Sequence, residues 1–171
     1  LRHGATIIND VWGLRREPAL ASLAAESGAE LVLMHNRDSV DPSIDIVDDV
    51  LRFLEGSVAL ARRAGVRDEK IVLDPGMGFG KTPQQSLEVV RRLDALRGLG
   101  FRVLLGVSRK RTIGLLLDRP VDQRLHGTLA MNLWAMLDGV DIIRVHDVAA
   151  HVDARRILEA LGADAVIPEL Q

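Results

Sequence analysis

The chain has 171 residues, 47% of them hydrophobic and 27% charged, with a formal net charge of −2 at pH 7 and no cysteine. This is the balance of a globular domain that buries one sizeable core, and the charge gives no reason to expect nucleic acid as a partner. The absence of cysteine excludes disulfides and thiolate metal sites and fits a cytoplasmic location, and no apolar run approaches the ~20 residues of a membrane span, so we expect no membrane partner.

Along the chain, short apolar runs alternate with longer segments that have apolar residues at three- and four-residue spacing. The runs lack polar alternation, as buried parallel strands do, and they lie at Ala5–Asn9, Leu31–His35, Ile71–Asp74, Val103–Val107 and Ile142–His146. The spacing between them predicts helices over Pro18–Ser27, Ile44–Ala64, Pro83–Leu96, a short segment after Lys110, Gln123–Leu137 and Val152–Leu161. Glycines follow most of these helices, where a left-handed residue commonly ends them.

Five such βα units predict an α/β fold in a single domain, residues 1–171. Two architectures fit the pattern. One is a doubly wound open sheet, and the other is part of a (β/α)₈ TIM barrel, whose full length is typically ~250 residues. The pattern alone favours the open sheet because that architecture needs no further units. The chain begins with Leu1 and not with Met, and we expect it to start within a domain.

Polar or charged side chains stand at the carboxyl end of every predicted strand, the edge that carries the binding site in parallel α/β folds. Arg144 and His146 are two residues apart on the last strand, so they share a face. Asn9 and Asp74 offer a carboxamide and a carboxylate that suit an aminopyrimidine-like edge. Lys110, Arg144 and His146 offer three basic groups for an anion such as a phosphate. The sequence therefore predicts a ligand with both characters.

Two local segments have competing interpretations. Gly76–Thr82 resembles a phosphate loop, but a Walker A motif requires glycine where Pro75 stands, so the spacing excludes that motif. A flexible turn between a strand and a helix accounts for its glycines. Ser108–Lys110 enters a helix, where exposed N–H groups and two cations predict either an anion site or a solvated helix start.

The histidines need separate interpretations. His146 is interpreted as a ligand-binding residue because Arg144 accompanies it, and Asp147 is expected to orient its ring. His35 follows the second run but has no zinc-ligand spacing with His146. His151 is interpreted as incidental.

Taken together, these segments resemble dihydropteroate synthase, in the order and spacing of that family and over essentially the whole chain. The matching segments are Ile7–Val11, Leu33–His35, Leu73–Thr82, Gly106–Lys110, His126–Thr128 and Ile143–Val148. The resemblance implies a (β/α)₈ barrel in which the five strands here are strands four to eight. It also implies that this is a C-terminal portion, an incomplete pterin-binding domain that lacks the first three βα units.

The resemblance implies a pterin site and a pyrophosphate site. Asn9 and Asp74 would hydrogen-bond the pyrimidine edge of the pterin, and Met34 would line the pocket. Arg144 would stack on the pterin and, with His146, would bind the pyrophosphate.

An aminobenzoate site is implied as well, made by Phe79, Lys110 and Arg111. Lys110 would also lie against the pterin, and the catalytic set would be Lys110, Arg144 and His146. Two segments depart from the family pattern. Residues 36–39 differ from the usual loop and are expected not to touch the core motifs, and Arg111 stands where many relatives have serine.

The implied reaction joins a pterin diphosphate to p-aminobenzoate with release of pyrophosphate, in folate biosynthesis. Mg²⁺ would bind the leaving pyrophosphate, with its protein ligand in the absent N-terminal part and none in this chain. The family resemblance also implies a homodimer. Because closing loops are expected to be absent as well, we expect the 171-residue chain alone to be poorly active or inactive.

Two alternatives stay open at this stage. A methyltetrahydrofolate:corrinoid methyltransferase shares the pterin-binding barrel, but it has no use for the pyrophosphate-binding cations. The chain is otherwise interpretable as a catalytically incomplete pterin-binding fragment.

Overall fold

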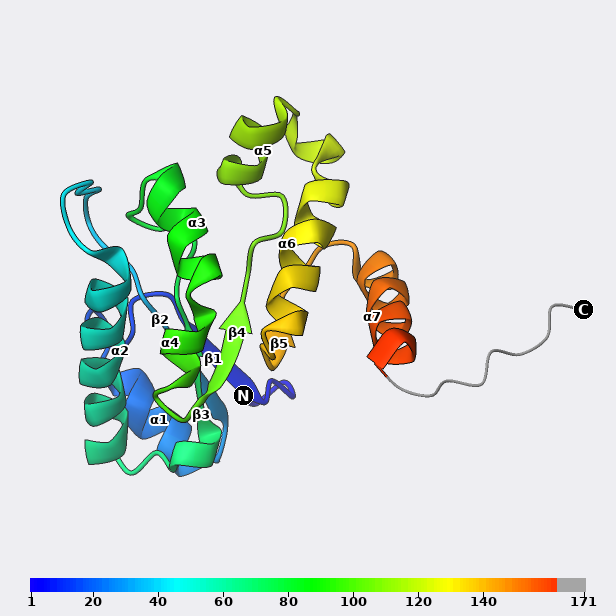
Figure 1. The fold of residues 1–171 in the computed structure, drawn as a ribbon. Coiled ribbons are helices and arrows are strands. Elements are labelled where there is room, and N and C mark those ends of the chain that lie inside the picture. Colours follow the sequence, from blue (N-terminus) through cyan, green and yellow to red (C-terminus); the bar gives the residue numbers. More distant parts are fainter. Residues whose placement is uncertain (163–171) are drawn as a thin grey trace, which may run out of the picture.

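The computed structural model describes residues 1–162, in which strands and helices alternate (Figure 1). The strands are β1 Ile7–Asp10, β2 Glu30–Met34, β3 Ile71–Asp74, β4 Arg102–Leu105 and β5 Ile142–Ile143. The helices are α1 Ala19–Ser27, α2 Ile46–Arg63, α3 Pro83–Arg91, α4 Leu93–Arg97, α5 Arg111–Leu117, α6 Leu125–Leu137 and α7 Val148–Gly162, with short 3₁₀ turns at Asp68–Lys70 and Val121–Gln123. Residues 163–171 of the predicted domain lie outside the described residues.

The strands form one parallel sheet in the order β1-β2-β3-β4-β5, the same order as in the sequence. A doubly wound sheet reverses its strand order at a switch point, whereas a barrel adds each strand beside the previous one. The sheet is a curled half-barrel. The α/β class and the barrel architecture are therefore confirmed, and the open sheet that the pattern alone favoured is wrong.

The two faces of the sheet have different neighbours, because successive side chains in a strand point to opposite faces. One face packs against the helices and joins the main hydrophobic core through Leu31, Leu33, Ile71, Leu73, Val103 and Leu105. The alternate residues form a separate small cluster of Val32, Val72, Leu104 and partly buried Ile142. We call this second face the inner face, because it is the side that a barrel encloses.

Helix α2 shows how the outer layer is built. Asp45 accepts hydrogen bonds from the backbone N–H groups of Val47 and Asp48 at 3.0 and 3.1 Å, which satisfies donors that a helix start leaves unpaired. Its buried side chains recur every three or four residues, so one stripe faces the sheet: Ile46, Val50, Leu54, Val58 and Ala61. This packing holds the carboxyl end of β2 in place.

Three predicted boundaries are wrong. The segment Pro83–Leu96 is two helices, because Arg92 adopts φ −113° and ψ 38° and interrupts the helical hydrogen bonding. The strand predicted over Ile142–His146 ends at Ile143, after which one further backbone bond joins the Arg144 N–H to the Leu105 carbonyl at 2.9 Å. The chain then turns into α7, which begins at Val148 and not at Val152.

Glycine is required at position 76 for two separable reasons. Gly76 has φ +64°, and a Cβ there would lie 1.9 Å from the carbonyl oxygen of His35. Gly28 has a similar φ of +68° but no atom within 4 Å of its Cβ position. We expect Gly28→Ala to lower the free energy of unfolding by about 1 kcal/mol from left-handed strain, and Gly76→Ala by roughly 3 kcal/mol or more, because the clash adds to that strain. Urea denaturation of both variants measures the difference, and equal losses would contradict the clash.

Candidate functional site

Four of the predicted site residues lie on the inner face at the carboxyl end of the sheet. Met34 and Asp74 are register partners, and each lies two residues beyond a member of the inner cluster. Asn9 is in register with Val32 of that cluster, and Arg144 lies two residues beyond Ile142. Because the pleat alternates, these side chains share one face. The structure thus brings together four of the five residues predicted for the pterin, and the fifth, Lys110, comes from the segment before α5.

Asp74 is a buried carboxylate with one free oxygen. Its side chain is 2% exposed, and Oδ1 accepts a hydrogen bond from the Gly76 N–H at 2.7 Å. Oδ2 has no hydrogen-bond partner among residues 1–162, and the Arg144 guanidinium lies 3.6 Å away. Burial raises the pKa of the Asp74 carboxyl, against the opposing effects of the Gly76 N–H and of Lys110. A buried acceptor without a donor is costly, so this oxygen is suited to an N–H group of a ligand.

Arg144 places a planar cation across the inner face. Its guanidinium donates to Asn9 Oδ1 at 3.0 Å and is 45% exposed. Gly106 makes room for it, since a Cβ at that position would lie 3.0 Å from the guanidinium. A planar guanidinium in this position can stack on a flat ring and pair with an anion.

Lys110 precedes helix α5 and reaches back to the loop after β3. Its Nζ donates to the carbonyl of Met77 and lies 4.7 Å from the centroid of the Phe79 ring. Burial lowers the pKa of Lys110 to about 8, with a further lowering by Arg144 and an opposing effect of Asp74. Arg111, the third residue predicted for the aminobenzoate site, is exposed at the first position of α5.

His146 is held by Ser108 and not by Asp147. The Ser108 hydroxyl accepts from the His146 backbone N–H at 3.2 Å and lies 2.8 Å from its Nδ1. If that hydroxyl donates to Nδ1, the neutral ring carries its proton on Nε2. Arg144 donates instead to Asn9. Arg144 and His146 both come directly after β5, but they have different partners.

The Asp147 carboxylate instead pairs with Arg109, at 2.6 and 3.2 Å, which lowers the pKa of Asp147. Arg109 has φ +58°, and its N–H donates to Thr128 Oγ1 at 3.1 Å. Of the two cations at the predicted anion site Ser108–Lys110, Arg109 is therefore already paired, and within residues 1–162 Lys110 has no ion-pair partner. His151 is not incidental, because its buried ring contacts the Asp147 carbonyl at 2.8 Å and Asn132 at 2.9 Å.

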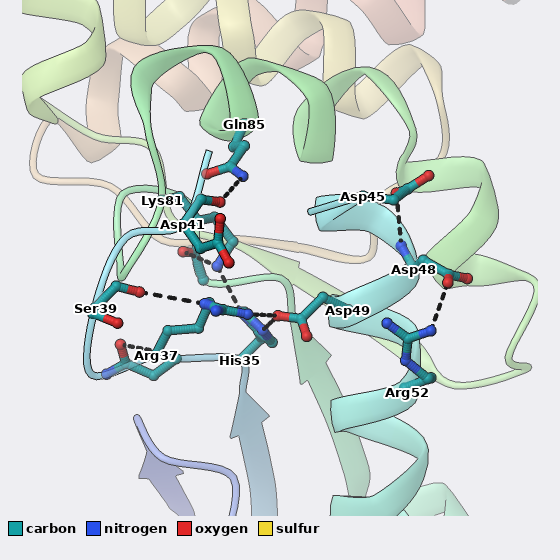
Figure 2. A network of polar contacts seen from close by, with 12 residues as sticks. His35, Arg37, Ser39, Asp41, Asp45, Asp48, Asp49, Arg52, Lys81 and Gln85 are labelled. Carbon is teal, nitrogen blue, oxygen red and sulfur yellow. Dashed lines mark hydrogen bonds and ion pairs between the residues drawn. The ribbon is translucent and has the colours of Figure 1, made fainter. Parts of the chain in front are cut away.

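Lys81, which was not among the predicted site residues, belongs to the loop between β3 and α3, and its side chain is buried (Figure 2). This residue is 7% exposed, and its Nζ contacts His35 Nδ1 at 2.7 Å, the Gly76 carbonyl at 2.9 Å and the Phe79 carbonyl at 3.1 Å. Burial lowers the pKa of Lys81 to about 7, against an opposing effect of Asp74. The loop is therefore pinned from within and is not the flexible turn that its glycines indicated.

His35 extends this network from β2 to helix α2. The fully buried ring contacts Asp49 Oδ2 through Nε2 at 3.1 Å, and Arg37 donates to the same oxygen at 2.6 Å (Figure 2). Burial, with a contribution from Lys81, lowers the pKa of His35 to about 4. Burial alone would raise the pKa of the Asp49 carboxyl, but the hydrogen bonds from Arg37 and His35 outweigh it and lower that pKa.

The loop over residues 36–39 touches the core motifs, contrary to expectation. A Cβ on Gly80 would lie 2.5 Å from the Arg37 Cβ and 2.8 Å from its carbonyl oxygen, so the two backbones pack directly against each other. Gln85 adds a bond to the Asp41 carbonyl at 2.7 Å. The signal in the sequence was the glycine at position 80, which permits this approach.

Metal clusters and membrane-spanning helices are both missing from residues 1–162. No group of three or more His, Asp or Glu side chains in this part of the chain is arranged to hold a metal ion. None of the helices described there combines the length and the apolar character that a bilayer span requires.

With the fold and site established, comparison with known proteins places the chain. The profile of the family described as pterin binding enzyme matches residues 1–146, and the chain belongs to this family. The chain is 42% identical over 159 residues to the dihydropteroate synthase of Clostridium beijerinckii, covering 92% of this chain and 59% of that protein. It thus spans about three fifths of the length of this curated relative.

Solved structures agree in fold as well as in sequence. The dihydropteroate synthase of Clostridium difficile, crystallised in the presence of pteroic acid, superposes with a TM-score of 0.89 at 45% identity, over 94% of this chain and 61% of that one. The dihydropteroate synthase of Thermus thermophilus in complex with 4-aminobenzoate gives 0.87 at 42% identity, over 95% of this chain and 68% of that one.

The neutral state of His35 predicts a loss of stability in acid. The pKa falls from 6.5 to about 4 in the folded protein, so the unfolded state binds more protons between these values. The free energy of unfolding should therefore fall as pH decreases through this window, by about 3 kcal/mol in total for this group. Urea denaturation between pH 7 and pH 4 measures the slope.

Replacement of His35 by Asn should flatten that slope, and replacement of the exposed His3 by Asn should leave it unchanged. Parallel curves for all three proteins would show that His35 does not titrate in this window.

Proposed function

We propose that this chain carries the pterin-binding part of a dihydropteroate synthase. The reaction joins 6-hydroxymethyl-7,8-dihydropterin diphosphate to p-aminobenzoate and yields 7,8-dihydropteroate and pyrophosphate, in folate biosynthesis. The observation that carries the proposal is the buried Oδ2 of Asp74 beside Arg144, which receives no hydrogen bond from residues 1–162. The Clostridium difficile enzyme was crystallised with pteroic acid, which contains both a pterin and an aminobenzoate, and the Thermus thermophilus enzyme with 4-aminobenzoate; both ligands support the two substrates.

The inner face suits the pterin. Asp74 Oδ2 would accept a hydrogen bond from the aminopyrimidine edge, and Asn9 would offer its carboxamide beside it. Met34 is fully buried below them and provides an apolar floor. The Arg144 guanidinium would lie against the ring and would exchange its bond with Asn9 for contacts with the ligand.

The basic groups suit the diphosphate. Lys110 and Arg144 stand beside one buried carboxylate, Asp74, so the local charge is positive, and His146 adds a further donor. Cations that face a leaving group stabilise the negative charge that develops on it. We assign pyrophosphate binding to Arg144 and His146, with Lys110 completing the catalytic set.

The aminobenzoate would lie on the side of Lys110 that faces the loop after β3. Phe79 offers a ring for stacking, and Lys110 lies against that ring. Arg111 is exposed nearby at the start of α5, where its guanidinium can pair with the carboxylate of the aminobenzoate.

These placements account for the chemistry in terms of this chain's own residues. The C–O bond between the pterin methylene and the diphosphate breaks, the electron pair leaves with pyrophosphate, and the amine nitrogen forms the new C–N bond and then loses a proton. The amine needs only to be positioned, so no covalent enzyme nucleophile is required. The expected Mg²⁺ stays a prediction, and since residues 1–162 show no cluster arranged to hold it, no step is assigned to it.

The geometry disfavours one of the two alternatives, and turnover decides the other. A corrinoid methyltransferase would use Asn9 and Asp74, but would leave Lys110 and Arg144 without an anion. A pterin-binding fragment without turnover would show binding alone. A homodimer, a cytoplasmic location and a domain over residues 1–171 remain predictions from the sequence.

Turnover of the full natural protein tests the function. We expect pyrophosphate release that requires both the pterin diphosphate and p-aminobenzoate, with dihydropteroate as the second product. Pterin binding without pyrophosphate release, or methyl transfer to a corrinoid, would contradict the proposal.

Asp74→Asn tests the residue that carries it. The Gly76 N–H would retain the amide oxygen, so the amide NH₂ would replace Oδ2 and oppose the donors of the pterin. We expect kcat/KM to fall by about 100-fold or more, since a mispaired buried donor costs about 3 kcal/mol. Asp153→Asn, an exposed replacement in α7, is the matched control, and similar kinetics for both variants would argue against the assigned role.

A further inference from the structure

The loop between β3 and α3 carries the aminobenzoate side of the proposed site, but its backbone is intrinsically free. Gly76, Gly78 and Gly80 all have positive φ, at +64°, +81° and +56°. Glycine loses more conformational freedom on folding than any other residue, so something must hold this loop in one conformation. Phe79 and the carbonyl of Met77, both on this loop, are what Lys110 contacts.

We propose that Lys81 is a positioning residue that fixes the aminobenzoate side of the site by pinning the loop over residues 76–79 from within. Its ammonium group reaches two loop carbonyls, those of Gly76 and Phe79, and a ring nitrogen of His35. Lys81 acts on the substrate through Phe79 and Lys110. This inference rests on the proposed function, because it names the substrate whose binding the loop controls.

The contacts of Lys81 Nζ fit a charged ammonium group better than a neutral amine. An ammonium has three donors, and Lys81 has three acceptors at 2.7, 2.9 and 3.1 Å. His35 accepts through Nδ1 because its Nε2–H is directed to Asp49, at 3.1 Å. The Asp49 carboxylate thus sets the histidine tautomer, and the histidine in turn completes the cage around Lys81 (Figure 2). Arg37 holds Asp49 at 2.6 Å.

Stability alone does not explain a charge in this place. Lys81 is 7% exposed, and no carboxylate among residues 1–162 lies within ion-pair distance of its Nζ. Replacing a buried charge by an apolar side chain of similar volume is often neutral or stabilising. Burying this ammonium costs free energy. We expect the buried charge to hold the loop in one conformation, because two of its three hydrogen bonds go to loop carbonyls.

The other bonds of the loop leave a gap that Lys81 fills. The Gly78 N–H donates to Ser86 Oγ at 3.2 Å, and the Phe79 N–H donates to the Gly76 carbonyl at 3.0 Å. The Gly76 carbonyl thus has a donor besides Lys81, and the Met77 carbonyl accepts from Lys110. Among residues 1–162, the donor to the Phe79 carbonyl is Lys81. Loss of Lys81 would remove that bond, and the Phe79 ring would no longer be directed at Lys110.

The test compares Lys81→Met with Lys70→Met in the full natural protein. Methionine keeps the length of the side chain and removes its donors, and Lys70 lies in a 3₁₀ turn that precedes β3, at the opposite end of that strand. We expect Lys81→Met to raise KM for p-aminobenzoate about tenfold or more, with KM for the pterin diphosphate within about twofold of the wild type. Lys70→Met should change neither.

Two further readouts separate positioning from general damage. Lys81→Ala should recover part of its aminobenzoate affinity when ethylamine is added, because the small cation can occupy the cage. Hydrogen exchange of the amides over residues 77–80 should be faster in Lys81→Met than in Lys70→Met, and this measurement needs no activity. If Lys81→Met does not fold, His35→Leu, which removes one of the three acceptors, should show the same selective rise in KM.

The pH profile provides an internal check. The pKa of Lys81 is lowered to about 7, so the ammonium is lost as pH rises through neutrality. KM for p-aminobenzoate should therefore rise above pH 7 in the wild type and should be flatter in Lys81→Met. The comparison with the variant is needed because other charged groups face Lys81 from neighbouring elements, namely His35, Arg37, Asp49, Asp74 and Lys110.

The outcomes are distinguishable. An unchanged KM for p-aminobenzoate in a folded Lys81→Met protein, or an equal effect on both substrates, would overturn the positioning role while leaving the proposed function intact. A wild-type protein that forms no dihydropteroate would overturn the proposed function, and the role of Lys81 would then be decided by hydrogen exchange alone. Unchanged exchange over residues 77–80 would overturn it.

Discussion

The site depends on the alternation of side chains in a sheet whose helices, within residues 1–162, cover one face. Because every second residue points to the inner face, Asn9, Asp74 and Arg144 converge at one edge although they come from three different strands. A slip of one residue in β3 would turn Asp74 into the apolar layer beneath the helices and would turn Leu73 toward the ligand. The parity of the strands therefore fixes the chemistry of the site as well as the core.

Much of this arrangement could be predicted from the sequence, and the reason is local. The run Ile71–Asp74 is entirely apolar until its last residue, so both the strand and its polar end were correctly placed. The early end of β5 could not be predicted, because apolar residues recur as far as Val145, and the turn into α7 depends on Ser108, which holds His146 from the segment after β4. The family resemblance predicted the barrel, whereas periodicity alone favoured the open sheet.

Two buried ionic groups in the site region differ in a way that no pattern reveals. Asp74 has one oxygen that receives no hydrogen bond from residues 1–162, whereas Lys81 has an acceptor for every donor. The Asp74 carboxylate is arranged to bind a ligand, and the Lys81 ammonium is arranged to hold the loop after β3. The contact that completes the second joins residues 46 positions apart, His35 and Lys81, and a lone histidine and a lysine after glycine give no sign of each other in the sequence.

The bond between Arg144 and Asn9 joins residues 135 positions apart and links the last strand of the sheet to the first. Such long-range contacts form late in folding, because the intervening chain must be ordered first. The arrangement of Asn9, Asp74 and Arg144 is thus absent from any state in which either end of the sheet has detached. A bound pterin would bridge both ends, so its binding free energy would add to the cohesion of the whole sheet. A bound ligand would then oppose detachment of the two outer strands, β1 and β5.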